Sequence, residues 1–92
     1  MEIQQHDDGK IGAFFIEWEG SREAEMTYVW AGATRIIIDH TEVSDKLRGK
    51  NAGRQLVAKA VEFAREKGIK IMPLCPFAKS VFEKVTEFQD VL

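Results

Sequence analysis

The spacing of apolar residues changes at Ser44, and this change constrains the fold more than any other feature of the 92-residue chain. Before Ser44, apolar residues alternate with polar ones or run continuously, as in β-strands. After it they recur every three or four residues, as in amphipathic helices. The predicted order is strand, strand, strand, helix, strand, helix, at residues 10–18, 24–30, 35–43, 52–67, 69–74 and from 77 onward.

Two of these elements carry the clearest patterns. Three consecutive isoleucines, Ile36 to Ile38, are typical of a central strand that is covered on both faces. The helix at 52–67 has an apolar stripe, and Gly68 follows it as a left-handed C-cap. The buried stripe predicted for the last helix is Phe77, Val81, Phe82, Val85 and Phe88. A strand–helix–strand crossover is right-handed and places its two strands parallel. We therefore predict an α/β (α+β) fold with a mixed, mostly antiparallel sheet and two helices.

Composition and charge limit the possible partners. Thirteen Lys and Arg against fifteen Asp and Glu give a net charge of −2, which disfavours a nucleic-acid or anionic-membrane partner. The longest uncharged stretch, residues 26–34, is too short to span a bilayer, and the acidic N-terminus is not a secretory signal. The single Cys75 excludes an intramolecular disulfide or a multi-cysteine zinc site and suits a reducing cytosol. We predict one cytoplasmic domain over residues 1–92, without a metal site.

The strongest functional signal is the polar loop before the first helix. Its sequence is Arg48-Gly49-Lys50-Asn51-Ala52-Gly53, followed by Arg54. A helix start offers free backbone N–H groups and the positive end of the helix dipole, which together bind anions, most often phosphate. The P-loop and Rossmann glycine patterns are missing. An anion site and an ordinary solvated loop that caps a helix are both compatible with the spacing.

The same loop resembles the R-x-x-G-x-G/A acetyl-CoA signature of the GNAT N-acetyltransferase superfamily, with Asn51 at the first glycine. Asn tolerates the left-handed backbone that the position needs. The similarity extends to a short, single-domain branch in which H-T-E-V precedes an R-G-K signature and P-L-C-P-F follows the next strand. Those motifs are residues 40–43 and 73–77 here, and the resemblance covers roughly residues 28–92. It implies a cut-down GNAT fold, acetyl-CoA (coenzyme A) as cofactor, and an amine or protein as acetyl acceptor.

The resemblance also implies which residues hold the cofactor. The pyrophosphate is expected on the backbone amides of residues 49–53, with Arg48, Lys50 and Arg54 nearby. Pantetheine is expected beside the backbone of Glu42 and Val43, where the two parallel strands separate, and Phe77 is expected to wall the far side. The predicted cofactor-binding residues are Glu42, Val43, Arg48, Gly49, Lys50, Asn51, Ala52, Gly53, Arg54 and Phe77.

Cys75 and His40 are the candidate catalytic residues. Cys75 precedes Pro76 at the start of a helix, where a thiol is stabilised as thiolate, although a lone cysteine is also a common packing residue. The resemblance implies that Cys75 lies beside the acetyl thioester and can accept the acyl group. Period-two alternation predicts His40 on the face of Ile36 and Ile38, where it could approach Cys75 as a base. The alternative is a strand histidine bonded to backbone. Glu42 is a second base candidate on the same face as His40.

Two departures from the larger GNAT enzymes keep other functions open. The last helix of the larger enzymes carries an asparagine, an alanine and a tyrosine that protonates the leaving CoA thiolate. When that stretch is aligned on Ala78, Cys75 replaces the asparagine and Phe82 replaces the tyrosine. We also expect the N-terminal strand and helices that bind the acceptor to be missing. The alternatives to an acetyltransferase are a non-catalytic acyl-CoA-binding or protein-interaction module, and a phosphate- or nucleotide-binding regulator that uses the same loop.

Overall fold

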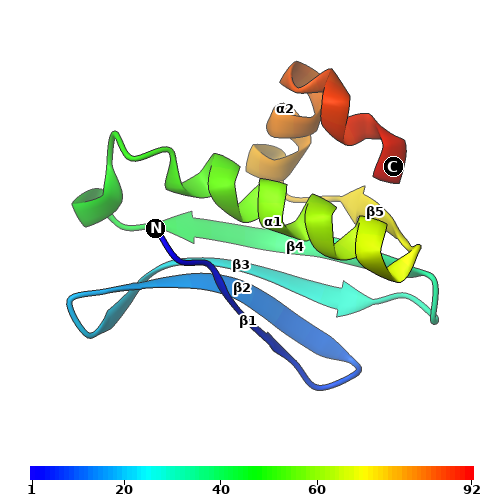
Figure 1. The fold of residues 1–92 in the computed structure, drawn as a ribbon, viewed down its shortest axis with the longest axis horizontal. Coiled ribbons are helices and arrows are strands. Elements are labelled where there is room, and N and C mark those ends of the chain that lie inside the picture. The colour runs from blue at the N-terminus through cyan, green and yellow to red at the C-terminus, as the bar shows by residue number, and fades with distance from the viewer.

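A computed structural model describes all residues from 1 to 92 and is shown in Figure 1. The chain forms a five-stranded sheet, two α-helices and two short 3₁₀-helices. In chain order the elements are β1 (Gln4–Asp7), β2 (Ile11–Trp18), β3 (Ser21–Trp30), β4 (Arg35–Val43), η1 (Asp45–Leu47), α1 (Ala52–Lys67), β5 (Lys70–Pro73), α2 (Pro76–Lys84) and η2 (Thr86–Val91).

The strands lie side by side in sequence order, from β1 to β5. The first four are antiparallel to their neighbours, and β4 pairs in parallel with β5 through the α1 crossover. The predicted fold class, a mixed and mostly antiparallel sheet with two helices, is confirmed. The structure adds one strand, β1, ahead of the predicted order, so the order is β-β-β-β-α-β-α and an N-terminal strand is present after all.

Polar side chains hold β1 in place. Its four residues, Gln-Gln-His-Asp, carry no apolar alternation, yet they pair antiparallel with β2. Gln5 Nε2 donates to the hydroxyl of Tyr28 at 2.9 Å. The Tyr28 hydroxyl and the Trp30 indole N–H, at 2.5 and 3.0 Å, both donate to one carboxylate oxygen of Asp7. A strand that is stabilised by backbone pairing and such contacts has no hydrophobic signature in the sequence.

One face of the sheet packs against both helices (Figure 1). Residues at alternate positions of β2 to β5 point into a core of 22 buried residues together with the apolar stripe of α1. That stripe is the predicted one, Leu56, Val57, Ala60, Val61 and Ala64. Gly68 ends α1 in a left-handed conformation (φ 67°), as expected for a helix C-cap. None of the helices is both long and apolar enough to cross a membrane.

No helix covers the opposite face of the sheet, which we call the open face. In β4, Ile36 and Ile38 are fully buried against the helices, whereas Ile37 lies between them in the alternation and is only half-buried on the open face. The expectation that this strand is covered on both faces is therefore wrong. An apolar run predicted the central position of β4 correctly, but it could not tell whether a second layer is present.

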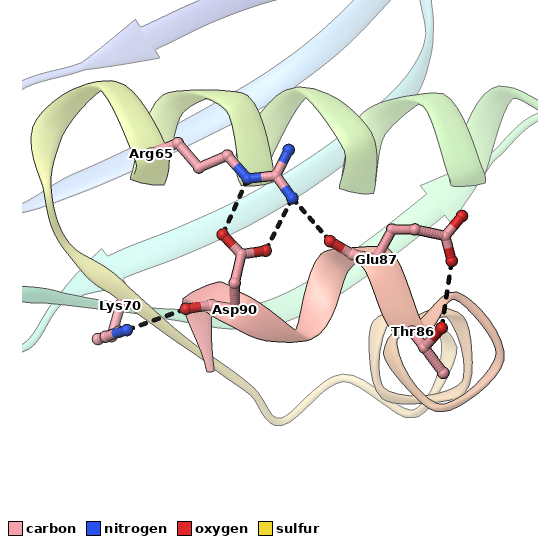
Figure 2. A network of polar contacts seen from close by, with 5 residues as sticks. All are labelled: Arg65, Lys70, Thr86, Glu87 and Asp90. Carbon is pink, nitrogen blue, oxygen red and sulfur yellow. Dashed lines mark hydrogen bonds and ion pairs between the residues drawn. The ribbon is translucent and has the colours of Figure 1, made fainter.

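The C-terminal segment folds back against α1 (Figure 2). The predicted second helix ends at Lys84, and its last expected apolar residue, Phe88, belongs to the separate 3₁₀-helix η2. The Arg65 guanidinium of α1 donates twice to the carboxylate of Asp90, at 2.7 and 3.0 Å, and once to the carbonyl of Glu87 at 2.7 Å. Lys70 of β5 donates to the Asp90 carbonyl at 2.9 Å. Arg65 and Lys70 thus fasten η2 to two neighbouring elements.

We expect Arg65→Ala to lower the melting temperature at pH 7, because it removes the three hydrogen bonds that the Arg65 guanidinium donates to Asp90 and Glu87. The Arg65 guanidinium lowers the pKa of Asp90. The ion pair therefore stabilises the fold above the pKa of about 4 of an unfolded aspartate and is lost as the pH falls through the folded value. The difference from wild type should shrink in acid. Lys59→Ala, which breaks the exposed pair with Glu62, is the matched control, and thermal melts at pH 7 and pH 3 are the measurement.

Candidate active site

The start of α1 leaves backbone donors free. Asn51, the residue before the helix, has the left-handed φ of 62° that its place in the loop requires, and its side chain does not cap the helix. The first backbone hydrogen bond of α1 is donated by the Gln55 N–H to the Asn51 carbonyl. The N–H groups of Gly53 and Arg54 have no backbone acceptor. These donors, at the positive end of the helix dipole, suit an anionic ligand.

A cleft of about 650 Å³ opens between this helix start and α2. Three of its lining side chains are cationic, Lys50, Arg54 and Lys84, and none is acidic. None of the three lies within 4 Å of a carboxylate; the Lys50 ammonium instead lies 5.0 Å from the centre of the Trp18 ring. The lining residues are Val43, Gly49, Lys50, Asn51, Gly53, Arg54, Phe77, Ser80, Val81, Lys84 and Val85. In a protein with a net charge of −2, this cleft is a local concentration of positive charge.

The structure brings seven of the ten predicted cofactor-binding residues together in the cleft lining and places the other three elsewhere. Arg48 is exposed and pairs with Asp45 at 2.7 Å. Ala52 is buried in the core. Glu42 lies on the open face. It pairs with Glu25 of β3, and Met26, the next residue of β3, points to the helices, so Glu25 and Glu42 point away from them. The loop motif predicts backbone position well but does not show which side chain turns toward the cleft.

Four lining residues after Phe77 were missed: Ser80, Val81 and Lys84 of α2, and Val85 immediately after the helix. Measured from Phe77 they stand at three, four, seven and eight positions along the helix, which is the spacing of one helix face. That spacing was present in the sequence. The same spacing places Val81 and Val85 in the predicted buried stripe, so it does not mark their polar neighbours Ser80 and Lys84 as part of a binding surface.

Phe77 packs directly on the first turn of α1. A Cβ atom on Gly53 would lie 2.4 Å from the Phe77 ring, closer than real Cβ atoms come to a non-bonded atom of a distant residue. Gly53 is therefore required for this contact, in addition to its place in the loop motif. The Phe77 side chain is 41% exposed, so its ring forms a wall of the cleft and not part of the predicted buried stripe.

The two parallel strands separate beside this cleft. Pairing of β4 with β5 ends at Ile38 and Pro73, and the N–H groups of Leu74 and Cys75 both donate to the Ile38 carbonyl, at 2.9 and 3.1 Å. β4 continues to Val43 without a partner on that side. The gap between separating strands is a usual ligand position in α/β proteins, and here its far end, Val43, lines the cleft.

Cys75 lies at this point of separation, immediately before α2. Its sulfur is 3.3 Å from the hydroxyl oxygen of Thr41 on β4, and the residue is only 5% exposed. Burial raises the pKa of the Cys75 thiol. Hydrogen bonds to the sulfur from the Thr41 hydroxyl and from the backbone N–H groups of Ala78, Phe77 and Thr41 outweigh that effect, so the net result is a lowered pKa. The start of α2 thus favours the thiolate, which is the nucleophilic form.

His40 does not face Cys75. A β-bulge in β4 shifts the register, so that Tyr28 pairs with Ile38 whereas the preceding residue, Thr27, pairs with His40. The extra residue, Asp39, moves His40 to the open face, where its imidazole is 3.5 Å from the Glu42 carboxylate and 62% exposed. The predicted placement on the face of Ile36 and Ile38 is wrong because simple alternation does not include a bulge. His40 and Glu42 do share a face, as predicted, and Thr41 takes the position beside the thiol.

We expect Thr41→Val to raise the pKa of Cys75 and to slow alkylation by iodoacetamide several-fold at pH 7, because the variant loses the hydroxyl that stabilises the thiolate. The measurement is the alkylation rate as a function of pH, whose midpoint should move to higher pH. His40→Ala, on the other side of the sheet, is the control and should leave the midpoint unchanged. If only His40→Ala moves the midpoint, the imidazole acts on the sulfur and Thr41 does not.

Comparison with known proteins identifies the family. Residues 13–91 match the model of the family described as GCN5-related N-acetyl-transferase. The chain therefore belongs to the GCN5-related N-acetyltransferase family, in agreement with the resemblance of its loop and flanking motifs. Within that family the structure is a compact form, with one α-helix between β4 and β5 and one after β5.

Individual relatives agree with this assignment. Protein NATD1 of Gallus gallus is 30% identical over 74 residues, which are 79% of this chain and 67% of NATD1. The NMR structure of a GCN5-like protein from Staphylococcus aureus is 42% identical, with a TM-score of 0.76 over 98% of this chain and 85% of that one. A streptothricin acetyltransferase-like protein from Bacillus anthracis, solved with acetyl coenzyme A, is 18% identical, with a TM-score of 0.60 over 73% of this chain and 39% of that one. This last likeness concerns the fold alone.

Proposed function

We propose that this protein binds acetyl-CoA in the cleft between α1 and α2 and transfers the acetyl group to an amine through Cys75. The observation that carries the proposal is the cleft itself: three cations without a carboxylate partner surround a helix start whose N–H groups are free. Acetyl-CoA carries a diphosphate, a 3′-phosphate and a thioester. The phosphates fit the cationic cleft, and the thioester arm would follow the unpaired edge of β4 from Val43 in the cleft lining to Thr41, which contacts the Cys75 sulfur. Acetyl-CoA is also bound in the Bacillus anthracis neighbour.

The proposed binding mode assigns a part of the cofactor to each wall. Backbone N–H groups of residues 51–54 and the side chains of Lys50 and Arg54 hold the diphosphate. The unpaired edge of β4 near Val43 offers backbone groups to the amide-containing pantetheine arm. Phe77 covers the far side, and Lys84 lies on the face of α2 that the 3′-phosphate can reach.

In the proposed reaction the Cys75 sulfur forms a bond to the acetyl carbon while the bond from that carbon to the CoA sulfur breaks. The thiol proton of Cys75 ends on the departing CoA sulfur. The nitrogen of the acceptor amine then bonds to the acetyl carbon while the bond from that carbon to the Cys75 sulfur breaks. The departing sulfur takes a proton from that nitrogen, and the thiol is restored. Thr41 and the first N–H groups of α2 lower the cost of the thiolate in both steps.

A second candidate function, acyl-CoA binding without transfer, is favoured by Phe82. In the alignment on Ala78 this residue replaces the tyrosine acid expected of larger acetyltransferases, and it is buried in the core, 2% exposed and without an ionisable group. One experiment separates the two functions. After incubation with acetyl-CoA, intact-mass spectrometry should show a protein heavier by one acetyl group. An unchanged mass, together with CoA binding in calorimetry, would support the binding module instead.

Lys84→Ala is expected to weaken CoA binding by about 5- to 30-fold, or roughly 1–2 kcal/mol, because it removes one charge-assisted contact to a phosphate. The affinity for dephospho-CoA, which lacks the 3′-phosphate, should fall much less from wild type to variant. Calorimetry with both ligands is the measurement. Lys79→Ala, on the same helix but outside the cleft lining, and Arg48→Ala, whose charge is paired with Asp45, are the matched controls. If Arg48→Ala is the variant that loses affinity, the guanidinium leaves Asp45 for the cofactor.

A further inference from the structure

An apolar row crosses the open face of the sheet. Ile11 of β2 pairs with Val29 of β3, Val29 pairs with Ile37 of β4, and Ile37 pairs with Met72 of β5, so four large apolar side chains stand side by side on four adjacent strands. Ile11 is 55% exposed and Met72 is 38% exposed, while Val29 and Ile37 are half-buried. The neighbouring residues of each strand point to the helices. A continuous apolar row on an uncovered sheet face is typical of an interaction site.

Two opposite charges flank this apolar row at equal spacing along β4. Arg35 is two residues before Ile37 and Asp39 is two residues after it, and both are exposed. The Arg35 side chain makes no ion pair. Asp39 lies on the open face, because its carboxylate accepts a hydrogen bond at 2.6 Å from Thr27, which points away from the helices. One side of the apolar row is therefore positive and the other negative.

We propose that the open face is a homodimer interface, in which two copies pack face to face about a two-fold axis that lies along the apolar row. A rotation of this kind places each copy's apolar row on that of the other copy. It also reverses the direction of β4, so Arg35 of each copy lies over Asp39 of the other. Packed sheets lie about 10 Å apart, a gap that an arginine and an aspartate side chain can bridge together.

The charge pattern selects a second copy of this chain and also this axis. An interface between identical faces must be complementary to itself, and equal but opposite charges at equal distances from a line meet that condition. A two-fold axis along the strand direction would instead place Arg35 over Arg35 and Asp39 over Asp39, which is repulsive. The cofactor cleft lies on the helix side of the sheet, so both clefts of the dimer remain accessible.

The charges allow a direct test by exchange. Sedimentation equilibrium of wild type should give a mass that approaches twice 10.5 kDa as the concentration rises to the millimolar range. Arg35→Asp and Asp39→Arg each place like charges opposite each other and should weaken dimerisation at least about 10-fold. The double variant restores opposite charges and should recover dimerisation. If the single variants instead act locally, for example through loss of the Asp39–Thr27 hydrogen bond, the double variant will also fail to dimerise. That result would overturn the proposed pairing.

A second variant tests the apolar row. Ile11→Glu changes a side chain that is already mostly exposed, so the fold should persist while the dimer dissociates. Lys59→Asp, on the exposed side of α1, is the control and should remain dimeric. Wild type that stays at 10.5 kDa at millimolar concentration, or Ile11→Glu that dimerises normally, would overturn the proposal. CoA affinity should be the same in all these variants, so the interface and the cofactor site are tested separately.

Discussion

Replacing Gly53 with aspartate is expected to abolish measurable CoA binding, with a loss of at least about 100-fold, or roughly 3 kcal/mol. The new carboxylate would stand at the first turn of α1, between the free N–H groups and the cations that we assign to the diphosphate. It would repel the phosphates and pair with Lys50 or Arg54. Its Cβ would also displace the Phe77 ring, which lies 2.4 Å from that position. Calorimetry with CoA measures the loss.

Gly53→Ala separates the two causes. It displaces the same ring without adding a charge, so it should lose clearly less affinity than the aspartate variant. The fold should survive both changes, because the Phe77 ring is partly exposed and can turn outward. Circular dichroism and thermal melts check this. Unchanged affinity in Gly53→Asp would mean that CoA does not bind at this helix start.

Cys75→Ser is expected to eliminate the acetylated protein while leaving CoA affinity within about two-fold of wild type. A hydroxyl is almost the same size as a thiol but does not ionise near neutral pH, so the nucleophile is lost and the cofactor cleft is kept. Cys75 is the only cysteine, so a thioester-linked acetyl group, which hydroxylamine releases readily at neutral pH, can only be carried by this residue. Intact-mass spectrometry before and after hydroxylamine is the measurement.

The opposite outcome is equally specific. If Cys75→Ser still gains an acetyl group, and that group resists hydroxylamine, the acetyl has been transferred to an amine of the protein without the thiol. Cys75 would then be a packing residue. The reaction would proceed by direct transfer from the thioester, with a proton acceptor other than the sulfur.

Most of the fold could be predicted because its elements carry strong periodic patterns. The alternation in β3, the isoleucines of β4 and the stripe of α1 are each fixed by burial against one core. β1 was missed because its stability comes from backbone pairing and from contacts between Asp7, Tyr28 and Trp30, for which the sequence has no local signal. The uncovered face behind Ile37 was missed because an apolar run does not report how many layers pack on it.

The candidate site was predicted in part for a similar reason. Loop residues such as Gly49 and Gly53 are constrained by backbone geometry, which a short motif can encode. The orientation of a side chain depends on its contacts with distant residues. Arg48 turns to Asp45, and His40 turns to Glu42 on the other side of the sheet. Lys84 enters the cleft from α2, an element that the loop motif does not include.

The bulge in β4 determines which side chain meets the thiol of Cys75. If the strand kept Asp39 but had no bulge, regular alternation would turn His40 toward the helices and Thr41 toward the open face, so an imidazole would replace the hydroxyl beside the thiol. Deletion of Asp39 would not have this effect. Because Thr27 already pairs with His40, the deletion would remove only the extra residue, and His40 would stay on the open face with Thr41 beside the thiol. The hydroxyl-supported cysteine therefore depends on the register of β4 and survives loss of the one residue that the strand pairing does not use.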